Sequence, residues 1–298
     1  MSSICIAGGV TFDSIVSMNE FPDKRGQTVF SSGYHETIGG TGSGKALAAS
    51  RLFDSTILHY MAGDDRDGEF IKGYLSSNGI KLLTDVDPAG TEKHINLMNA
   101  HGERISIYVK YGTFEPVFNH QPIVDACKKS DYIVLNIINY TRYLIPEIKK
   151  LNKEIWCDIH DYDLDNPYHN DYIQAADYIF MSSDALDDYR SLMTGFIENG
   201  KKLVVCTHAK QGSTLLTKET GFIDLGICDN FKRVDTNGAG DNFMIGFMYA
   251  WSKGRSPEIC QKYATIAAGL CISSKEIIHT DLSIDLLEDA FLSNTFIK

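Results

Sequence analysis

Short apolar runs alternate with amphipathic stretches along most of the chain. Continuous apolar runs are typical of strands buried on both faces. Residues 4–7 form such a run, and further strands are expected at the largely apolar segments 57–62, 132–135, 155–159, 178–181 and 203–206. Apolar residues at helical spacing lie between several of these runs, at about 121–129, 141–151 and 184–194. This alternation predicts an α/β fold, with parallel strands and helices on both faces of the sheet.

The pattern changes in two segments of the first half. Residues 28–35 are rich in β-branched and aromatic side chains without a helical period, and residues 95–109 alternate polar and apolar around a turn at 99–102. Such patterns predict partly exposed strands, and the second segment predicts a hairpin. Another hairpin is expected from 214–217 and 222–225, and helices are expected at 46–53, 244–251, 256–273 and 281–292.

Length and composition narrow the function classes. The chain has 298 residues, which suits one large α/β domain or two small ones. Its net charge of −11 argues against a general binder of nucleic acid or anionic membranes. The seven cysteines are an odd number without a CxxC pair, several of them in apolar runs. We therefore expect reduced, buried thiols in a cytoplasmic protein without signal peptide or membrane span.

The strongest chemical signal is the stretch DTNGAGDNF at 235–243, which runs directly into the apolar helix expected at 244–251. Small residues at 238–240 allow a tight turn close to a ligand. The helix that follows points free N–H groups and the positive end of its dipole at this turn, which favours anion binding. Asp241 fits two roles, a helix N-cap or a general base. The spacing alone leaves both open.

The nonapeptide resembles the C-terminal signature DTxGAGDxF of the ribokinase-like (PfkB) carbohydrate kinase family, with every fixed position present. The resemblance implies one domain over 1–298. Its fold would be a three-layer α/β/α sandwich with a mostly parallel central sheet and a small β-sheet lid formed by about 15–38 and 92–112. It also implies transfer of the γ-phosphoryl group of ATP to a primary hydroxyl of a small carbohydrate. Asp241 would be the base, and Gly238, Ala239 and Gly240 would form the anion hole.

A second glycine-rich stretch, GGTGSGKA at 39–46, nearly matches the P-loop pattern but ends in Ala46, which has no hydroxyl for Mg²⁺. It is more similar to the family's first signature, GGxGxNxAxxxxRL. The family asparagine, which helps to hold the sugar, falls at Gly44, and the adjacent Lys45 is a candidate to compensate. A P-loop NTPase stays open as a further alternative.

Other acceptor contacts are expected where predicted strands end, because ligands of open α/β sheets bind outside the carboxyl ends of strands. Asp13 follows the first strand and resembles the family's sugar-binding aspartate. The predicted acceptor-binding residues are Asp13, Gly39, Gly40, Gly44, Lys45, Asn136 and Asp158.

The nucleotide is expected at the other end of the site. The segment 207–212 resembles the family's TxGxxG loop, with Ala209 in place of glycine. The predicted nucleotide-binding residues are Thr207, Lys210, Gly212, Asp235, Thr236 and Thr265. The family's NxxE positions, linked to Mg²⁺, fall at Ser182 and Ala185, which leaves Asp184 or Asp187 as substitutes and the metal ligands unknown. The resemblance implies ATP and Mg²⁺ as cofactors and leaves a monovalent cation open.

Two alternatives to a sugar kinase remain. The Tyr- and His-rich segment 140–172 leaves room for a base, which would suit a nucleoside kinase on the same fold. The departures at Gly44, Ser182, Ala185 and Ala209 would suit a catalytically impaired sugar- or nucleotide-binding protein. The predicted partner is a small sugar or nucleoside, with no nucleic acid and no membrane. The family's lid edges also allow a homodimer.

Overall fold

The computed structural model describes residues 2–101, 103–228, 230–293 and 296, and a large sheet forms its centre. The order of its strands is β13-β12-β11-β10-β9-β8-β1-β4-β5. Neighbouring strands from β11 to β5 in this order run parallel, whereas β12 pairs antiparallel with both β11 and β13. The strands are β1 (Ser3–Ala7), β4 (Ser55–Ala62), β5 (Lys81–Val86), β8 (Tyr132–Asn136), β9 (Ile155–Asp158), β10 (Tyr178–Ser182), β11 (Leu203–Thr207), β12 (Ser213–Thr217) and β13 (Gly221–Leu225).

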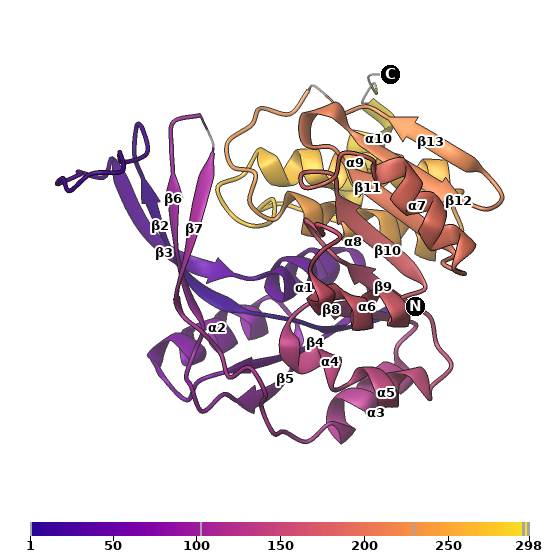
Figure 1. Cartoon of the computed structure of the whole chain (residues 1–298), viewed down its shortest axis with the longest axis horizontal. Coiled ribbons are helices and arrows are strands. Elements are labelled where there is room, and N and C mark those ends of the chain that lie inside the picture. Colours follow the sequence, from indigo (N-terminus) through magenta and orange to yellow (C-terminus); the bar gives the residue numbers. More distant parts are fainter. Residues whose placement is uncertain (1, 102, 229, 294–295, 297–298) are drawn as a thin grey trace.

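Helices cover both faces of this sheet (Figure 1). Ile4 and Ile6 of β1 belong to the core on one face, whereas Cys5 and Ala7 belong to the core on the other, as the alternation of strand side chains requires. The first face is packed by α1 (Thr41–Leu52), α2 (Arg66–Ser77), α8 (Ala239–Ser252), α9 (Pro257–Ile272) and α10 (Ile284–Ser293). The second is packed by α3 (Gln121–Lys129), α4 (Asn139–Arg142), α5 (Ile145–Lys149), α6 (Asn170–Ala175) and α7 (Tyr189–Glu198).

A smaller sheet projects from this body (Figure 1). Its order is β3-β2-β6-β7, formed by β2 (Thr11–Ser17), β3 (Gly33–Gly39), β6 (Lys93–Met98) and β7 (Arg104–Lys110). We call this sheet the lid. One face of β7 carries Ile105, Ile107 and Val109, which are exposed. The opposite face carries Arg104, Ser106 and Tyr108, which line a cavity. The predicted hairpin is thus present, although Gly102 of its turn lies outside the described residues.

Several predicted elements have different bounds. The strand expected at 28–35 runs over Gly33–Gly39, because its partner β2 ends at Ser17, which pairs with Gly33. The helix expected at 184–194 begins only at Tyr189, where Asp188 accepts a hydrogen bond from the Ser191 amide and caps it. The stretch 141–151 holds two short helices, α4 and α5, and a proline in the first turn of α5 prevents continuous hydrogen bonding.

The described part of the chain contains no helix that is both long and hydrophobic enough to cross a lipid bilayer.

Candidate active site

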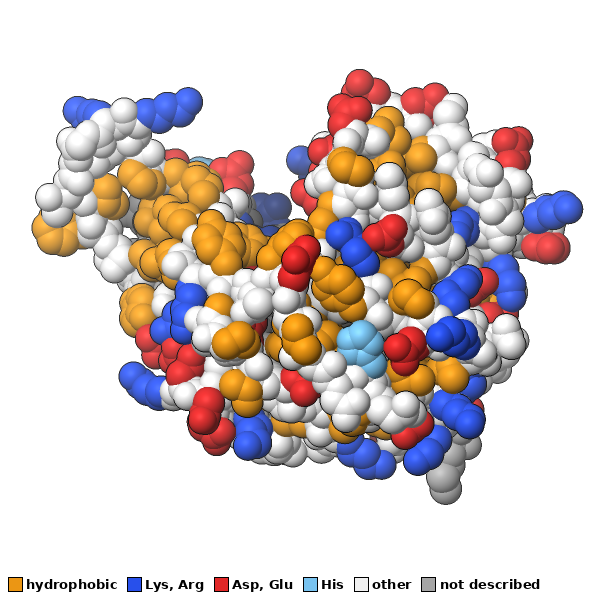
Figure 2. Space-filling view, turned by 60° about the horizontal axis from the view of Figure 1, so that its bottom comes forward, with side chains coloured by type: hydrophobic (Ala, Val, Ile, Leu, Met, Phe, Trp, Pro, Cys, Tyr) orange, Lys and Arg blue, Asp and Glu red, His pale blue; other side chains and the backbone are white. Residues whose placement is uncertain are grey.

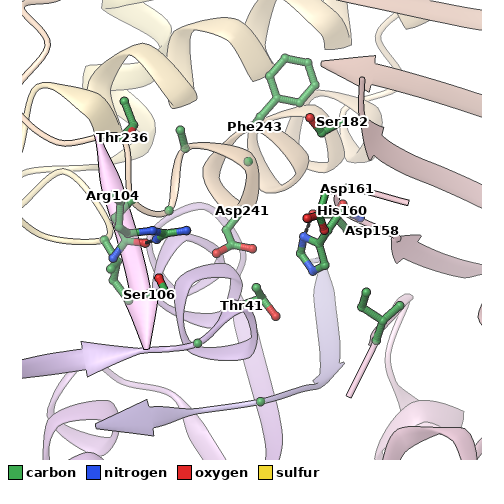
Figure 3. A pocket seen from close by; sticks show the side chains of 18 of the residues that line it. Thr41, Arg104, Ser106, Asp158, His160, Asp161, Ser182, Thr236, Asp241 and Phe243 are labelled. Carbon is green, nitrogen blue, oxygen red and sulfur yellow. Dashed lines mark hydrogen bonds and ion pairs between the residues drawn. The ribbon is translucent and has the colours of Figure 1, made fainter. Parts of the chain in front are cut away.

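A cavity of about 1780 Å³ lies between the lid and the carboxyl ends of the parallel strands. Figure 2 shows the hollow between the projecting lid and the rest of the molecule. Residues of the lid, of the strand ends and of the turn before α8 line it together, and Asp241 points into the space between them (Figure 3). The position agrees with the general location of ligand sites in open α/β sheets.

The turn before α8 is held by its glycine and by an asparagine. Gly238 has a φ of 78°, and a Cβ there would collide with the Ile277 carbonyl. Asn242 donates hydrogen bonds of 2.8 Å to the carbonyls of both Gly238 and Ile277, which ties the turn to the segment after α9. Because α8 begins at Ala239, the amides of Gly240 and Asp241 in its first turn have no acceptor within the helix, whereas the Ala239 amide donates to the Thr236 carbonyl.

Asp241 lies in this first turn and is 8% exposed. Its Oδ1 is 2.5 Å from Nζ of Lys45, and the same Nζ is 3.2 Å from Oδ2 of Asp158 at the end of β9. Burial raises the pKa of Asp241 although Lys45 opposes the shift. Burial acts on Asp158 in the same direction, but His160 and Lys45 outweigh it and hold the Asp158 pKa below its ordinary value.

The lid presents a chain of hydrogen bonds at the predicted acceptor end of the cavity. Asp13, on β2, is 3% exposed and accepts hydrogen bonds from Thr11 Oγ1 at 2.6 Å and Asn96 Nδ2 at 2.8 Å. Asn96 in turn accepts one from Ser106 Oγ on β7. Burial raises the pKa of Asp13, against the opposing effect of Thr11, His94 and Asn96. The carboxylate is thereby fixed across three strands.

Most of the predicted nucleotide-binding residues also reach the cavity. Thr207, Lys210, Gly212, Thr236 and Thr265 all line the cavity. The end of β11 and the loop after it bring the first three there, and Gly212 of this loop has a φ of 95°.

That loop also contains Ala209, at the position where the family signature has glycine. Its φ is 46°, in the left-handed region where an alanine side chain is unfavourable. The backbone of this loop therefore keeps a glycine-like conformation.

Five predicted binding residues do not line the cavity and support it from behind. Gly39 leaves space for the Asp13 carboxylate, and Gly44 leaves space for that of Asp241. Lys45 is fully buried behind Asp241. Asn136 Nδ2 donates to the Ala7 carbonyl, and Asp235 accepts a hydrogen bond from the Asn237 amide. The other predicted acceptor residues, Asp13, Gly40 and Asp158, line the cavity, as do Gly238, Ala239, Gly240 and Asp241.

Several residues that line the cavity were not among the predicted site residues. Arg104 and Ser106 reach the cavity from β7 (Figure 3). The polar positions of the alternating pattern at 95–109 were a signal for them, because the apolar positions of the same strand face outward. Aromatic residues also line the cavity, namely Tyr108 from the lid and Tyr111, Phe114, Tyr140 and Tyr168 from outside it.

The structure offers limited means of holding a metal. Among the described residues, no group of three or more His, Cys, Asp or Glu side chains is placed to bind one. Ser182 and Asp184 line the cavity, and the other two candidates, Ala185 and Asp187, do not. Of the two carboxylates expected as substitutes, Asp184 is therefore the one that reaches the cavity, and Mg²⁺ can bind through one or two carboxylates while it keeps several waters and contacts substrate phosphates.

Comparison with known proteins decides the family. A model described as pfkB family carbohydrate kinase matches residues 1–283. The chain belongs to this family. The match confirms the predicted family and enzyme class, a phosphotransferase with an alcohol group as acceptor.

Individual relatives differ in their named substrates. The chain is 25% identical to an acarbose 7(IV)-phosphotransferase of Actinoplanes sp. over 272 aligned residues. The alignment covers 89% of this chain and 90% of that protein. It is 27% identical to a ribokinase of Bacillus subtilis, over 92% of this chain and 94% of that protein. It is 25% identical to a nucleoside kinase of Methanothermobacter thermautotrophicus, over 90% of this chain and 88% of that protein.

Solved structures confirm the predicted ribokinase-like fold. A microbiome-derived acarbose kinase superposes with a TM-score of 0.88 at 22% identity, covering 98% of this chain and 99% of that one. A ribokinase of Arabidopsis thaliana complexed with ribose and ATP superposes with a TM-score of 0.83 at 20% identity, covering 98% of this chain and 99% of that one.

Proposed function

We propose that this protein transfers the γ-phosphoryl group of ATP to a primary hydroxyl of a carbohydrate, with Asp241 as general base. One observation carries the proposal. The Asp241 carboxylate is buried at the start of α8, in a single cavity that has the Asp13 network at one end and the glycine-turn loop of Thr207–Gly212 at the other. The acceptor and the nucleotide can therefore meet at this carboxylate.

The reaction needs positioning and charge stabilisation more than covalent chemistry by the protein. Asp13 and Gly40 orient the acceptor, and Asp241 takes the proton of its attacking hydroxyl. The amides of 238–241 stabilise the charge that develops on the transferred phosphoryl group. Mg²⁺, when bound with the nucleotide, neutralises phosphate charge, and we expect Asp184 to hold it. The lid keeps water away from the phosphoryl group.

The aromatic lining favours an acceptor with more than one ring. Tyr108 and Tyr111 stack with their ring centroids 6.0 Å apart and an interplanar angle of 12°, and they remain 51% and 69% exposed. Exposed, ordered aromatic faces beside a polar pocket can stack against sugar rings or a nucleobase. We therefore propose an oligosaccharide acceptor and keep a nucleoside as the second candidate. The relative from Actinoplanes is named as a phosphotransferase acting on acarbose.

The test is ATP consumption by the purified protein with Mg²⁺ and a panel of monosaccharides, oligosaccharides and nucleosides. Asp241→Asn serves as the blank, and we expect its turnover to fall by about two or more orders of magnitude with the fold retained. Turnover with one class that is lost in the variant supports the proposal and names the acceptor class. An active Asp241→Asn variant would refute Asp241 as the base. ATP binding without turnover on any acceptor would favour the impaired binding protein.

We further propose a homodimer through the lid, in a cytoplasmic protein whose single kinase domain spans 1–298. The exposed lid face with Ile105, Ile107 and Val109 supports the homodimer, because apolar side chains gathered on a sheet face favour association. Light scattering after gel filtration should give twice the chain mass, and Ile107→Lys should give the mass of one chain.

A further inference from the structure

Lys45 is a lysine without contact to solvent. Its side chain is 0% exposed, and its ammonium lies between the carboxylates of Asp241 and Asp158. A buried ammonium is unfavourable unless it is paired and hydrogen-bonded. The two carboxylates, from α8 and β9, provide this pairing, so that one side chain of α1 joins three elements behind the cavity.

The neighbouring Gly44 makes this arrangement possible. A Cβ at Gly44 would overlap the Asp241 carboxylate. Without that side chain, the carboxylate lies directly against the backbone of α1, within reach of the Lys45 ammonium. Gly44 and Lys45 therefore act together: the first provides the space for the carboxylate, and the second provides the charge that holds it there.

We infer that Lys45 is a positioning residue that fixes the Asp241 carboxylate and keeps it ionised for proton transfer. The inference rests on the proposed role of Asp241 as base. It replaces the expectation that Lys45 contacts the acceptor, since its ammonium faces the back of Asp241 and does not line the cavity.

The charges around Asp241 explain why a fixed cation is needed. Besides Lys45, the groups that act on Asp241 are Asp158, His160 and Cys271, from β9, the residues after it and α9. Burial and the negative Asp158 both favour the protonated, inactive form of Asp241. Lys45 opposes them and is itself held charged, because the two carboxylates outweigh the effect of burial and raise its pKa to about 12.

The test compares Lys45→Met with Lys45→Arg in the full chain with MgATP and the acceptor found by the panel. Without Lys45 the pKa of Asp241 rises, so a higher pH is needed to ionise the base. We expect the acid limb of the kcat pH profile to move up by about one unit or more. At a pH on this limb the kcat should fall about tenfold for each unit of that shift, with little change in the KM for ATP. Lys45→Arg keeps the charge and should keep the acid limb near its original position.

Lys201→Met is the matched control. Lys201 is also largely enclosed, but its ammonium donates to the Ala176 and Gln174 carbonyls, away from the cavity. We expect this variant to lose stability without a change in kcat or in the acid limb. If Lys45→Met does not fold, Lys45→Met combined with Asp158→Asn removes the uncompensated carboxylate as well. Because this double variant lacks Asp158, the proper reference is the Asp158→Asn single variant. We expect the acid limb of the double variant to lie at higher pH than that of Asp158→Asn.

Two outcomes separate the inference from the proposed function. In the first outcome, Asp241→Asn is inactive, but Lys45→Met has the acid limb and kcat of the unmodified protein, or the double variant has those of Asp158→Asn. The positioning role of Lys45 is then refuted, and Asp241 remains the proposed base. If Asp241→Asn is active, the proposed base itself is refuted, whatever Lys45 does.

Discussion

Replacing Gly44 with alanine measures how closely Asp241 is held against α1. The alanine alone would stabilise the helix by about 0.5–1 kcal/mol, because glycine loses more backbone freedom on folding. The added Cβ, however, would overlap the Asp241 carboxylate and force it away from Lys45. Breaking a buried ion pair costs about 3–5 kcal/mol. We therefore expect a net loss in the free energy of unfolding of about 2 kcal/mol or more, together with a fall in kcat.

Gly73→Ala in α2 is the matched control, because a Cβ at Gly73 meets no atom within 4 Å. Urea unfolding followed by circular dichroism gives the free energy of unfolding of each variant, and a coupled kinase assay gives kcat. Gly73→Ala should gain stability at unchanged kcat, whereas Gly44→Ala should lose both. Equal stability and kcat for the two variants would refute the close contact between α1 and Asp241.

Three further substitutions address other parts of the cavity. Arg104→Ala removes the 2.6 Å hydrogen bond from the lid to Asn237, and steady-state kinetics should show an acceptor KM raised by about tenfold, as expected for a charged hydrogen bond. An unchanged KM would show that this contact does not hold the lid. Asp13→Asn places an amide where Asn96 donates, and should raise the acceptor KM by about tenfold or more while ATP affinity, measured by calorimetry, stays the same. A normal acceptor KM would remove Asp13 from the acceptor site. Ala209→Gly relieves a left-handed backbone and should stabilise the chain by about 1 kcal/mol in urea unfolding; a loss would contradict strain at this residue.

The strands of the central sheet were predictable where both faces are buried. β1 and β11 form continuous apolar runs because a helical layer packs on each side of them. β5, at the edge of the sheet, was missed because most of its side chains are partly exposed and no apolar run results. The start of β3 was misplaced because the length of β2, and not the composition of 28–35, determines where pairing begins.

The candidate site was predictable where a residue belongs to a motif or follows a strand, as Asp241 and Asp158 do. Arg104 and Tyr108 belong to no motif, and only the pairing of β7 into the lid turns them toward the cavity. Lys45 was expected at the acceptor because it follows the family's sugar-binding position. Its actual direction depends on how α1 packs against α8 and β9, which the local sequence does not contain.

The pairing of Lys45 with two carboxylates has a consequence for the reaction itself. Before proton transfer the ammonium faces two negative charges, Asp241 and Asp158. If Asp241 is the base that we propose, it becomes neutral when it takes the proton of the acceptor hydroxyl, and a lysine with only that partner would be left as an uncompensated buried cation. The pKa of Asp158 lies below its ordinary value, whereas the pKa of Asp241 lies above its own. Asp158 is therefore the carboxylate that stays ionised. The Lys45–Asp158 pair therefore remains compensated in both states, which allows Asp241 to change its charge inside a buried site.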